Sequence, residues 1–514
     1  MTADHILAID LGTGGPKVAF VDLRGRVVAH EVETTSLILE PPDGVEQDPD
    51  DWWRAISTAV GRLVAAAPEE AASLIAVAVT SHWTGTVAVD HEGKAIGNSI
   101  IWMDSRGAPQ IAEAVSGRIN VMGYDPRRLK RWIQLTGGAP SHSGKDSLAH
   151  ILWLKDQRPE VYDAAERFLE PADYLNLRLT GRAVTSHDCV VMHWLTDNRN
   201  RDDVHYDPQL LAWTGVDKAK LPPLVGSATV VGPLLASVAG EWGIAAELPV
   251  TTAMGDVHAA VVGCGAVKDY EPHLYLGTSS WLSFHLPEKR TDIRNSMAAF
   301  PAALPGKYFL ANEHEAAGAC LLHARDQLRL VADLGELNEV AANAPAGSNK
   351  LIYLPWLNGE RTPVDDHTIR GGWTNLSLAH DRADMLRSIL EGVAYNSRWL
   401  LEVVEAFTKK PLGPIVVIGG GARSDLWCQI HADVMRRPIR RVEDYHHAGA
   451  RGVALVAAVA LGRITAEEID GLVAVEKEFT PDPSTAEVYD ELYDAFLATY
   501  KATKDIHARL NQGR

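Results

Sequence analysis

One stretch decides the fold: Ile6-Leu-Ala-Ile-Asp-Leu-Gly-Thr-Gly-Gly-Pro-Lys17, followed by Val-Ala-Phe-Val-Asp22. It predicts an apolar strand, a Gly-Thr turn and a second apolar strand. A stretch of the same design, Leu274-Tyr-Leu-Gly-Thr-Ser-Ser280 with Trp-Leu-Ser-Phe284 after it, lies in the second half of the chain. A Gly-Thr turn offers backbone N–H groups and a hydroxyl to an anion, because glycine has no Cβ to block the approach. Two such turns predict two lobes that grip one polyphosphate between them.

The size and charge of the chain limit its possible partners. With 514 residues it is too long for one hydrophobic core, so we expect two large domains with extensions. A net charge of −18 argues against nucleic acid as a partner, since binding nucleic acid needs clustered Lys and Arg. The same charge is compatible with ATP, because local N–H groups and Mg²⁺ can bind phosphate on an acidic protein.

The sequence also indicates the compartment. The N-terminal segment has no basic region before its apolar run, and the longest near-apolar run, from Gly452 to Gly462, is too short to span a bilayer. The cysteines are scattered and form no CxxC pair: Cys189, Cys264, Cys320 and Cys428. This pattern favours a reducing environment without structural zinc. We therefore predict a cytoplasmic protein without a membrane partner.

Strand-like runs alternate with helical stretches, which predicts an α/β fold. Strands are expected at 75–79 and 86–89, helices at 51–67, 148–155 (amphipathic) and 382–408, and an exposed polar loop at 197–209. A change of composition between 221 and 249 indicates a domain boundary near residue 250. The predicted division is a first lobe over 1–250, a second lobe over 251–484 and a helical tail over 485–514.

Two polar residues of the first stretch have two interpretations each. Asp10 ends the first strand just before the turn, where a carboxylate can hold Mg²⁺ through water beside phosphates. Aspartate also favours turns for purely structural reasons. Lys17 either touches phosphate or is a solvated lysine at the start of a strand. The second Gly-Thr turn favours the functional interpretation of Asp10.

Asp256 follows a strand in Ala253-Met-Gly-Asp-Val257 and opens a helix rich in small residues. An alcohol that attacks a γ-phosphate needs a base to accept its proton, and a carboxylate in a closing cleft suits that task. The alternative is a helix N-cap. The turn at 277–279 follows shortly afterwards, so we expect both in one cleft and favour the base.

A third segment is typical of a nucleoside contact. Ile415-Val-Val-Ile-Gly-Gly-Gly-Ala422 is an apolar strand followed by three glycines and the start of a helix. Glycines let a flat base or ribose approach the backbone closely, although tight turns need glycine too.

These residues together resemble the FGGY family of sugar and polyol kinases. The first turn (10–17), the Gly-Asp segment (255–256), the second turn (277–279) and the glycines (419–421) occur in the family's order, and 371–391 is similar to its C-terminal signature. The resemblance implies an α/β, two-lobed actin/hexokinase/Hsp70-like ATPase fold with duplicated ribonuclease H-like domains and an interlobe cleft. It also implies phosphorylation of a terminal hydroxyl by Mg·ATP and, by analogy, a possible homodimer.

The resemblance assigns roles residue by residue. It makes Asp256 the catalytic base and places Asp10 and Asp256 at the metal. It assigns phosphate binding to Gly12, Thr13, Lys17, Gly277, Thr278 and Ser279. The adenosine positions are Gly420, Gly421 and Asp425, with Ala422 beside them.

The substrate segments carry the specificity. Ile101-Trp-Met-Asp-Ser-Arg106 resembles the family's Trp-x-Asp-x-Arg stretch, in which Trp102 contacts substrate. Asp104 and Arg106 either bind sugar hydroxyls or form a buried salt bridge that shapes the pocket. Xylulokinases typically show Gln-Met-His-Gly where this chain has His82-Trp-Thr-Gly85.

Each residue of that segment again has two interpretations. His82 either hydrogen-bonds a hydroxyl or is a satisfied histidine at a strand end. Trp83 either stacks on a carbon chain or packs in the core. Thr84 replaces a usual sugar-binding histidine, which argues for a ketose or polyol other than the commonest one. The glycerol-kinase pattern Gln-Arg-Glu-Thr is absent, and Val257 stands where those enzymes tend to have glutamine, so glycerol is disfavoured.

Two further departures concern loop details. Asn375 stands where the family normally has glycine, and His150 where a lysine is usual. The function predicted from the resemblance is a xylulokinase-like kinase that phosphorylates a small ketose or polyol, with a pentulose such as xylulose first. The rivals are an actin- or chaperone-like ATPase with a protein partner, which would lack a sugar pocket, and a weak sugar sensor, which would lack the base.

Overall fold

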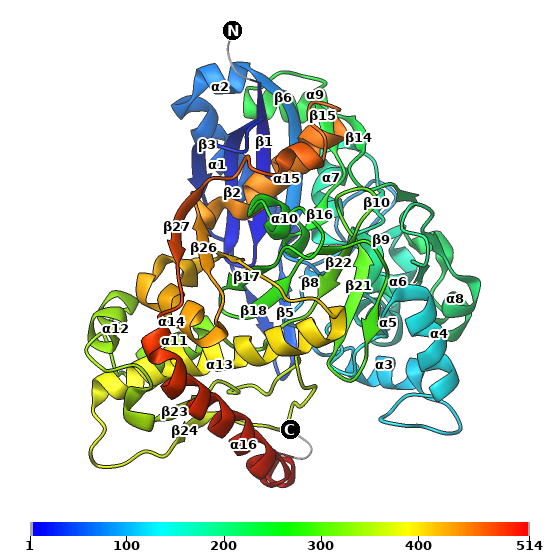
Figure 1. Cartoon of the computed structure of the whole chain (residues 1–514). Coiled ribbons are helices and arrows are strands. Elements are labelled where there is room, and N and C mark those ends of the chain that lie inside the picture. Colours follow the sequence, from blue (N-terminus) through cyan, green and yellow to red (C-terminus); the bar gives the residue numbers. More distant parts are fainter. Residues whose placement is uncertain (1–3, 512–514) are drawn as a thin grey trace.

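The first lobe is built on a seven-stranded sheet in the order β14-β15-β6-β1-β2-β3, with β16 also paired to β6. The computed structural model describes residues 4–511 (Figure 1). The strands are β1 (His5–Gly12), β2 (Gly15–Asp22), β3 (Val27–Val32), β6 (Leu74–Ser81), β14 (Val230–Pro233), β15 (Pro249–Thr251) and β16 (Met254–Gly255). β1 and β2 form an antiparallel hairpin, whereas β6 runs parallel to β1, β15 and β16. β1 and β6 are buried along nearly their whole length, so both read as continuous apolar runs.

The second lobe repeats this design in a five-stranded sheet of order β18-β17-β25-β26-β27. Its strands are β17 (His273–Leu276), β18 (Ser280–Ser283), β25 (Ile415–Ile418), β26 (Ile439–Val442) and β27 (Val475–Phe479). β17 and β18 form the antiparallel hairpin, and β25 and then β26 continue in parallel. The two matching stretches of sequence are therefore equivalent hairpins in two similar sheets, which confirms the predicted two-lobed α/β architecture.

Two helices lie between the lobes and share one core with them. α10 (Asp256–Gly263) packs against α15 (Ala448–Ala460), which also lies on β1, β2 and β6 although it comes late in the chain (Figure 1). The helices cross at glycines: a Cβ on Gly452 would lie 1.8 Å from the carbonyl oxygen of Ala259. Any side chain there would push the helices apart. α15 thus fastens the second half of the chain to the first sheet.

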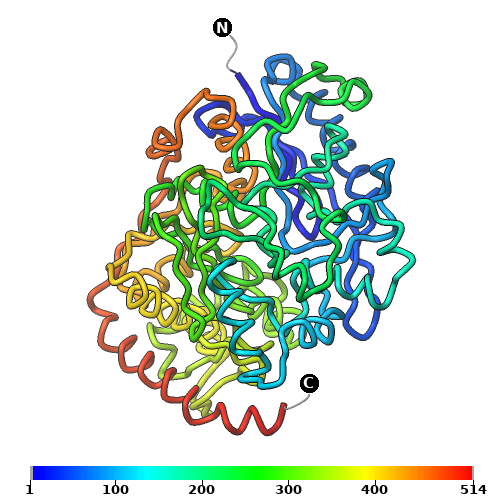
Figure 2. The backbone as a smooth tube through the Cα atoms, turned by 90° about the vertical axis from the view of Figure 1, so that its right-hand side faces the viewer, coloured from blue at the N-terminus to red at the C-terminus, as the bar shows by residue number. Residues whose placement is uncertain are grey.

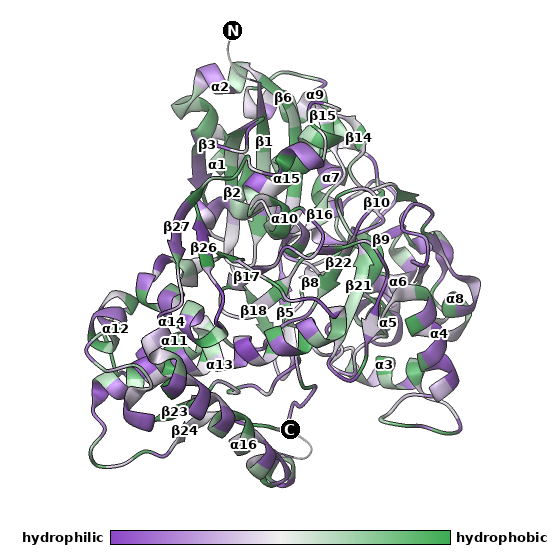
Figure 3. Cartoon of the chain, in the orientation of Figure 1, coloured by the Kyte–Doolittle hydropathy of each residue, from purple (hydrophilic) through white to green (hydrophobic). Residues whose placement is uncertain are grey.

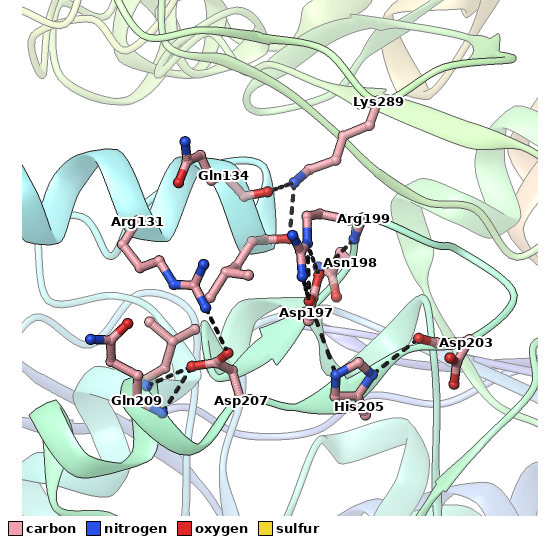
Figure 4. A network of polar contacts seen from close by, with 12 residues as sticks. Arg131, Gln134, Asp197, Asn198, Arg199, Asp203, His205, Asp207, Gln209 and Lys289 are labelled. Carbon is pink, nitrogen blue, oxygen red and sulfur yellow. Dashed lines mark hydrogen bonds and ion pairs between the residues drawn. The ribbon is translucent and has the colours of Figure 1, made fainter.

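A second connection joins a small sheet of the second half to a helix of the first. This sheet comprises β19 (His285–Leu286), β20 (Thr291–Asp292), β21 (Met297–Pro301) and β22 (Tyr308–Ala311). Before β20, Lys289 donates to the carbonyls of Gln134 at 2.6 Å and Leu135 at 2.9 Å, at the end of α4 (Pro126–Thr136) (Figure 4). A cation suits the carbonyls that a helix C-terminus leaves unpaired.

Of three local predictions, one holds only in part, one is wrong and one is confirmed. The segment 197–209 is an exposed loop only in its middle, where Arg199, Asn200, Asp202 and Asp203 are exposed. It begins in β11 (Thr196–Asp197), contains β12 (His205–Tyr206) and ends in α8 (Pro208–Thr214), and the Arg199 guanidinium donates to the Asp197 carboxylate (Figure 4). α5 (Ser147–Gln157) is buried on most sides rather than amphipathic, because even its polar His150 lies inside. The strand expected at 86–89 is β7 (Val87–Val89), which pairs with β9 (Arg167–Leu169) outside the main sheet.

Other helices agree with the sequence. α1 (Pro49–Ala66), α13 (Arg382–Thr408) and α14 (Asp425–Met435) occupy the expected segments, and α16 (Ala486–Asn511) runs along the outer edge of the second lobe (Figure 2). Asp381 and Asp384 form a capping box on α13. Hydrophobic residues gather in the central strands and helices, and hydrophilic ones on the outer helices (Figure 3). Within residues 4–511, every helix is too short or too polar to cross a membrane.

The remaining elements are shorter and lie mostly around the two sheets. The helices are α2 (Pro68–Ala72), α3 (Ala108–Val115), α6 (Pro159–Ala164), α7 (Pro171–Thr180), α9 (Ala236–Trp242), α11 (Gly318–Asp326) and α12 (Leu334–Ala341). The strands are β4 (Ile38–Glu40), β5 (Gly44–Gln47), β8 (Ser99–Ile100), β10 (Thr185–Ser186), β13 (Leu224–Val225), β23 (Ile352–Leu354) and β24 (Gly372–Thr374). The chain leaves the first sheet after Gly255, a few residues beyond the boundary predicted near 250.

Candidate active site

Three of the predicted site segments follow the carboxyl ends of neighbouring parallel strands. Ser81, the last residue of β6, lies opposite Leu11 of β1 on one side and Gly255 of β16 on the other. The first Gly-Thr turn, the segment 82–84 and Asp256 therefore meet at one edge of the first sheet. Ligands of α/β proteins bind at this edge of the sheet, because the strand ends leave a crevice there.

Asp10 and Asp256 form the acidic centre of this edge. Asp10 is 8% exposed, and burial raises the pKa of its carboxyl, whereas Lys17 opposite it in the hairpin lowers that pKa. Burial first, and then the negative charge of Asp10, raise the pKa of Asp256 to about 7. A carboxyl group with such a pKa exchanges its proton near neutral pH, which matches the requirement for a general base.

The N-terminus of α15 closes this acidic centre from the second half of the chain. A Cβ on Gly449 would lie 2.4 Å from a carboxylate oxygen of Asp10, so the helix backbone lies directly against that carboxylate. The positive end of a helix dipole favours negative charge. The arrangement thus helps to hold an ionised Asp10 in a buried place.

The first turn is held by side chains from two other segments. Gly12 pairs with Gly15 across the hairpin, so Thr13 and Gly14 form its tip. The indole Nε1 of Trp102 donates to the Thr13 hydroxyl at 3.0 Å, and the amide of Gln47 donates to the Thr13 carbonyl at 2.9 Å. Trp102, predicted to contact substrate, therefore reaches the phosphate turn. The sequence reasoning missed Gln47, because nothing local marks a glutamine in a short strand as a partner of this turn.

In the segment 82–84 two side chains are buried, and the third residue, half-buried Thr84, has a strained backbone. His82 is 3% exposed, burial lowers its pKa to about 4, and neither ring nitrogen has a partner within residues 4–511. The Trp83 indole donates to the carbonyl of Cys189 at 2.9 Å. This contact agrees with the interpretation that Trp83 packs in the core. Thr84 has a φ of 61°, in the left-handed region that a β-branched residue rarely adopts. Such strain often marks a functional position.

Asp104 and Arg106 form an ion pair, which is one of the two interpretations that the sequence allowed. Asp104 is 1% exposed and accepts from the Arg106 guanidinium at 2.9 Å and from the Val45 N–H at 2.9 Å. Arg106 also pairs with Glu46 and lies over the ring of Trp153 at 4.0 Å. The pair joins the segment 101–106 to β5. Direct contact of these two residues with a sugar stays a prediction.

A small cavity lies beside this ion pair. Its volume is about 340 Å³, and its walls include Asp43, Met103, Ser105 and Lys145. Carboxylate, hydroxyl and ammonium groups next to apolar walls are compatible with a polyhydroxylated molecule.

The second turn and the glycine run also follow neighbouring parallel strands. Tyr275 of β17 lies opposite Ile418 of β25, so Gly277, Thr278 and Ser279 come out beside Gly420 and its neighbours. Gly420 is exposed, and no atom lies within 4 Å of the place where its Cβ would be. This is the open approach that a nucleoside needs.

The other adenosine positions have partners within the protein. Gly421 packs beside Trp427, and buried Ala422 accepts at its carbonyl from Arg441 at 3.0 Å. Asp425 is exposed and pairs with Arg441 at 2.7 Å and with Lys477 at 2.6 Å. These ion pairs give Asp425 a structural role besides the predicted one.

The two departures from the family signatures have local explanations. Asn375 has a φ of 67°, and its side chain donates to the carbonyl of Lys350 at 2.9 Å. Glycine and asparagine are the residues that adopt this left-handed conformation most readily. His150 is buried and faces the Thr86 hydroxyl at 3.3 Å, and burial lowers its pKa to about 4, so it is neutral where a lysine is usual.

Comparisons with known proteins agree with this geometry. The model of the N-terminal domain of the FGGY family of carbohydrate kinases matches residues 5–263, and that of the C-terminal domain matches residues 274–461. The xylulose kinase of Staphylococcus epidermidis is 28% identical, with 99% of each chain covered. The gluconokinase of Bacillus subtilis is 24% identical, covering 96% of this chain and 95% of its own. Among solved structures, the xyloylose kinase from Brucella ovis superposes with a TM-score of 0.87 at 26% identity, covering 98% of this chain and 100% of its own.

Proposed function

Because the chain belongs to the FGGY family of carbohydrate kinases, we propose that it phosphorylates a pentulose such as xylulose, with Asp256 as the general base. The enzyme is an ATP-dependent sugar kinase. The observation that supports the assignment of the base is the place of Asp256 beside Asp10, at the edge of the first sheet that also carries the turn at 12–15, with a pKa of about 7.

The chemistry follows from this placement. Asp256 accepts the proton of a sugar hydroxyl, the hydroxyl oxygen bonds to the γ-phosphorus, and the bond from that phosphorus to the bridging oxygen breaks, so that ADP leaves with the electron pair. Backbone N–H groups and hydroxyls at 12–13 and 277–279, with Lys17, hold the phosphates, while Gly420, Gly421, Ala422 and Asp425 border the adenosine. Most of the catalysis is positioning and electrostatics. Closure of the lobes on the sugar would exclude water.

A magnesium ion fits the residues present. Within residues 4–511 no cluster of three or more His, Cys, Asp or Glu side chains is arranged to hold a metal. Mg²⁺ in kinases typically rests on one or two carboxylates together with the phosphates, and Asp10 and Asp256 supply two. When bound, the ion would neutralise charge on the transferred phosphoryl group.

The choice of a pentulose as substrate is based on the proteins that this chain is similar to. Xylulose kinases match the chain over nearly its whole length, which supports a substrate of that class. His82, Trp83 and Thr84 depart from the xylulokinase pattern, and a gluconokinase matches almost as widely, so another ketose, a polyol or an aldonic acid is the alternative. A protein-directed ATPase finds no support in the family match. Sugar binding is assigned to the lobe 1–250, with Trp102, Asp104 and Arg106, and nucleotide binding to 251–484.

A panel of acceptors tests the substrate. ADP release from Mg·ATP would be measured with xylulose, ribulose, gluconate, xylitol and glycerol against a blank without acceptor. The proposal expects a pentulose to raise the rate far above the blank. A response to gluconate or xylitol alone would reject the pentulose but keep the kinase. Sedimentation would test the homodimer that family analogy suggests, and cell fractionation the cytoplasmic location.

A further inference from the structure

We propose that Trp102 and Gln47 are positioning residues for the first phosphate turn, and that Trp102 commits the Thr13 hydroxyl to donate its proton to a bound phosphate. The inference rests on the proposed nucleotide-binding role of Thr13. It goes beyond that role by naming the side chains that orient the residue, and it gives Trp102 a role at the phosphate turn in addition to the proposed sugar contact.

Gln47 fixes the backbone of the turn. It is fully buried, its amide oxygen accepts from the indole of Trp52 at 3.2 Å, and its amide nitrogen donates to the Thr13 carbonyl at 2.9 Å. An indole N–H can only donate, so the oxygen of the amide must face Trp52 and the NH₂ group must face Thr13. The orientation of Gln47 is thereby determined. Its NH₂ group also faces the Thr35 hydroxyl at 3.3 Å and the Ser36 carbonyl at 3.5 Å, and the contact with the Thr13 carbonyl is the shortest of the three.

Trp102 fixes the side chain of the same residue. Its indole N–H reaches the Thr13 hydroxyl at 3.0 Å and, as a donor only, occupies a lone pair of that oxygen. Within residues 4–511 the Thr13 hydroxyl proton has no acceptor, and the residue is half-exposed at the tip of the hairpin. Ionised phosphoryl oxygens only accept hydrogen bonds. The hydroxyl is therefore held ready to donate to a phosphate.

The two positioning residues belong to one braced unit. Gln47 lies on β5, and the N–H of Val45 on the same strand donates to the carboxylate of Asp104 at 2.9 Å. Asp104 is two residues after Trp102 and is held in turn by Arg106. The buried ion pair thus sets the position of the segment that carries the indole. Removing the indole N–H should loosen the turn even when no sugar is present.

The competing interpretation is that Trp102 only packs against the sugar. The two interpretations differ in one readout, which is the affinity for nucleotide in the absence of sugar. A residue that only packs against the sugar changes the KM for sugar and leaves that affinity unchanged. A residue that orients Thr13 changes it directly.

The test is a double-mutant cycle on the full chain. The dissociation constant of a non-hydrolysable Mg·ATP analogue would be measured by calorimetry, without sugar, for Trp102→Phe, Thr13→Val, Thr13→Ser and the combinations. Loss of one hydrogen bond to the hydroxyl predicts about three- to tenfold weaker binding for Trp102→Phe. The same change should still weaken binding in the Thr13→Ser background, which keeps the hydroxyl, and have no effect in Thr13→Val, because neighbouring residues couple.

A matched control removes an equivalent bond elsewhere. The indole of Trp242 donates to the Ser57 hydroxyl at 2.9 Å, between α9 and α1, so Trp242→Phe makes the same chemical change away from the turn. It should leave the affinity for the analogue within about twofold of wild type.

Three outcomes distinguish failure of this inference from failure of the proposed nucleotide site. Unchanged analogue binding in Trp102→Phe, with a raised KM for sugar, would overturn the inference and leave Trp102 with the sugar contact alone. Additive effects of Trp102→Phe and Thr13→Val would also overturn it, because they would mean that the two residues act independently. Absence of analogue binding by the wild-type protein would instead reject the proposed nucleotide site itself. If Trp102→Phe does not fold, the affinity for the analogue would be measured with Gln47→Met instead. The inference expects weaker binding of the analogue by this variant, and unchanged binding would contradict it.

Discussion

Asp10 and Asp256 lie on the two sides of strand β6, where burial first, and then the negative charge of Asp10, raise the pKa of Asp256. Asp10 and Met254 are both opposite Thr80, and the Thr80 hydroxyl donates to the carbonyl of Met254 at 3.1 Å. The strand therefore spaces the two carboxyl groups. Like charges at such a place disfavour joint ionisation, so one group can accept a proton near neutral pH.

Asp256→Asn tests the base directly. The amide cannot accept the hydroxyl proton, so turnover should fall at least about a hundredfold. The affinity for Mg·ATP should stay within a few fold, because the phosphate turns are intact. Asp90→Asn, in a turn that caps its own loop, is the matched control and should keep turnover. Near-normal turnover of Asp256→Asn would remove Asp256 from the mechanism.

The activity should depend on the protonation of Asp256. As the pH falls through about 7 the carboxyl takes up a proton and can no longer act as a base, so kcat/KM should fall on the acid side. Asp10→Asn removes the neighbouring charge, and the acid limb of its residual activity should shift to lower pH. Rate profiles of both proteins measure the shift. An acid limb at the same pH in both would mean that Asp10 does not act on the titrating group.

The same shift predicts a gain in stability for Asp256→Asn. The folded-state pKa of Asp256 lies above the ordinary value of 3.8, so ionisation weakens the wild-type fold progressively as the pH rises through that range towards 7. The asparagine variant escapes this loss. Its advantage in free energy of unfolding should be about 1 kcal/mol at pH 8 and smaller at pH 5, because the group is half-buried and partly solvated. Urea unfolding at both pH values measures it, and an advantage that does not grow with pH would contradict the sign.

Gly449→Ala tests the contact between α15 and Asp10. The added methyl group would lie 2.4 Å from the carboxylate oxygen of Asp10, so either the helix or the carboxylate must move. Displacement at a catalytic centre is costly, and turnover should fall by about tenfold or more. Gly61→Ala on α1 adds the same methyl group where no atom lies within 4 Å. It should leave turnover unchanged, and equal losses in both variants would show that the contact is irrelevant.

Asn375 offers a test of the departure in the C-terminal signature. Its φ of 67° costs a residue with a Cβ about 1 kcal/mol, so Asn375→Ala should lower the free energy of unfolding by about that amount. Asn375→Gly restores the residue usual in the family and should be close to neutral. Unfolding midpoints of the two variants compare them. Equal destabilisation would mean that the hydrogen bond to Lys350, and not the backbone, decides the choice.

The sequence was informative where structure is local. Both hairpins carry their own signal, because Leu-Gly-Thr between apolar runs specifies strand, turn and strand. The helix predicted from 382 to 408 has the same bounds in the structure as α13. The order of the segments along the chain also predicted that the first turn and Asp256 follow neighbouring strands of the first sheet, while the turn at 277–279 lies in the hairpin of the second sheet. That all three meet at one bound nucleotide stays a prediction.

The remaining features depend on contacts between distant segments. No local pattern indicates that α15 packs on β1, that Gln47 binds the Thr13 carbonyl, or that Lys289 caps α4. The short strands β11 and β12, on either side of the loop at 198–204, give no local signal, because their pairing forms only once the chain is folded. Thr84 shows no sign in the sequence of its left-handed backbone. The ion pair of Asp104 and Arg106 was foreseen as one of two alternatives, and only the fold shows that it forms.

Transfer of the labelled γ-phosphoryl group from Mg·ATP to D-xylulose tests the central claim most directly. Labelled ATP would be incubated with wild type and Asp256→Asn, with and without the sugar, and the products separated. The account predicts a labelled sugar phosphate equal in amount to the ADP formed by wild type, and at least about a hundredfold less with Asp256→Asn. Label that appears only as inorganic phosphate, at a rate that the sugar does not alter, would contradict it.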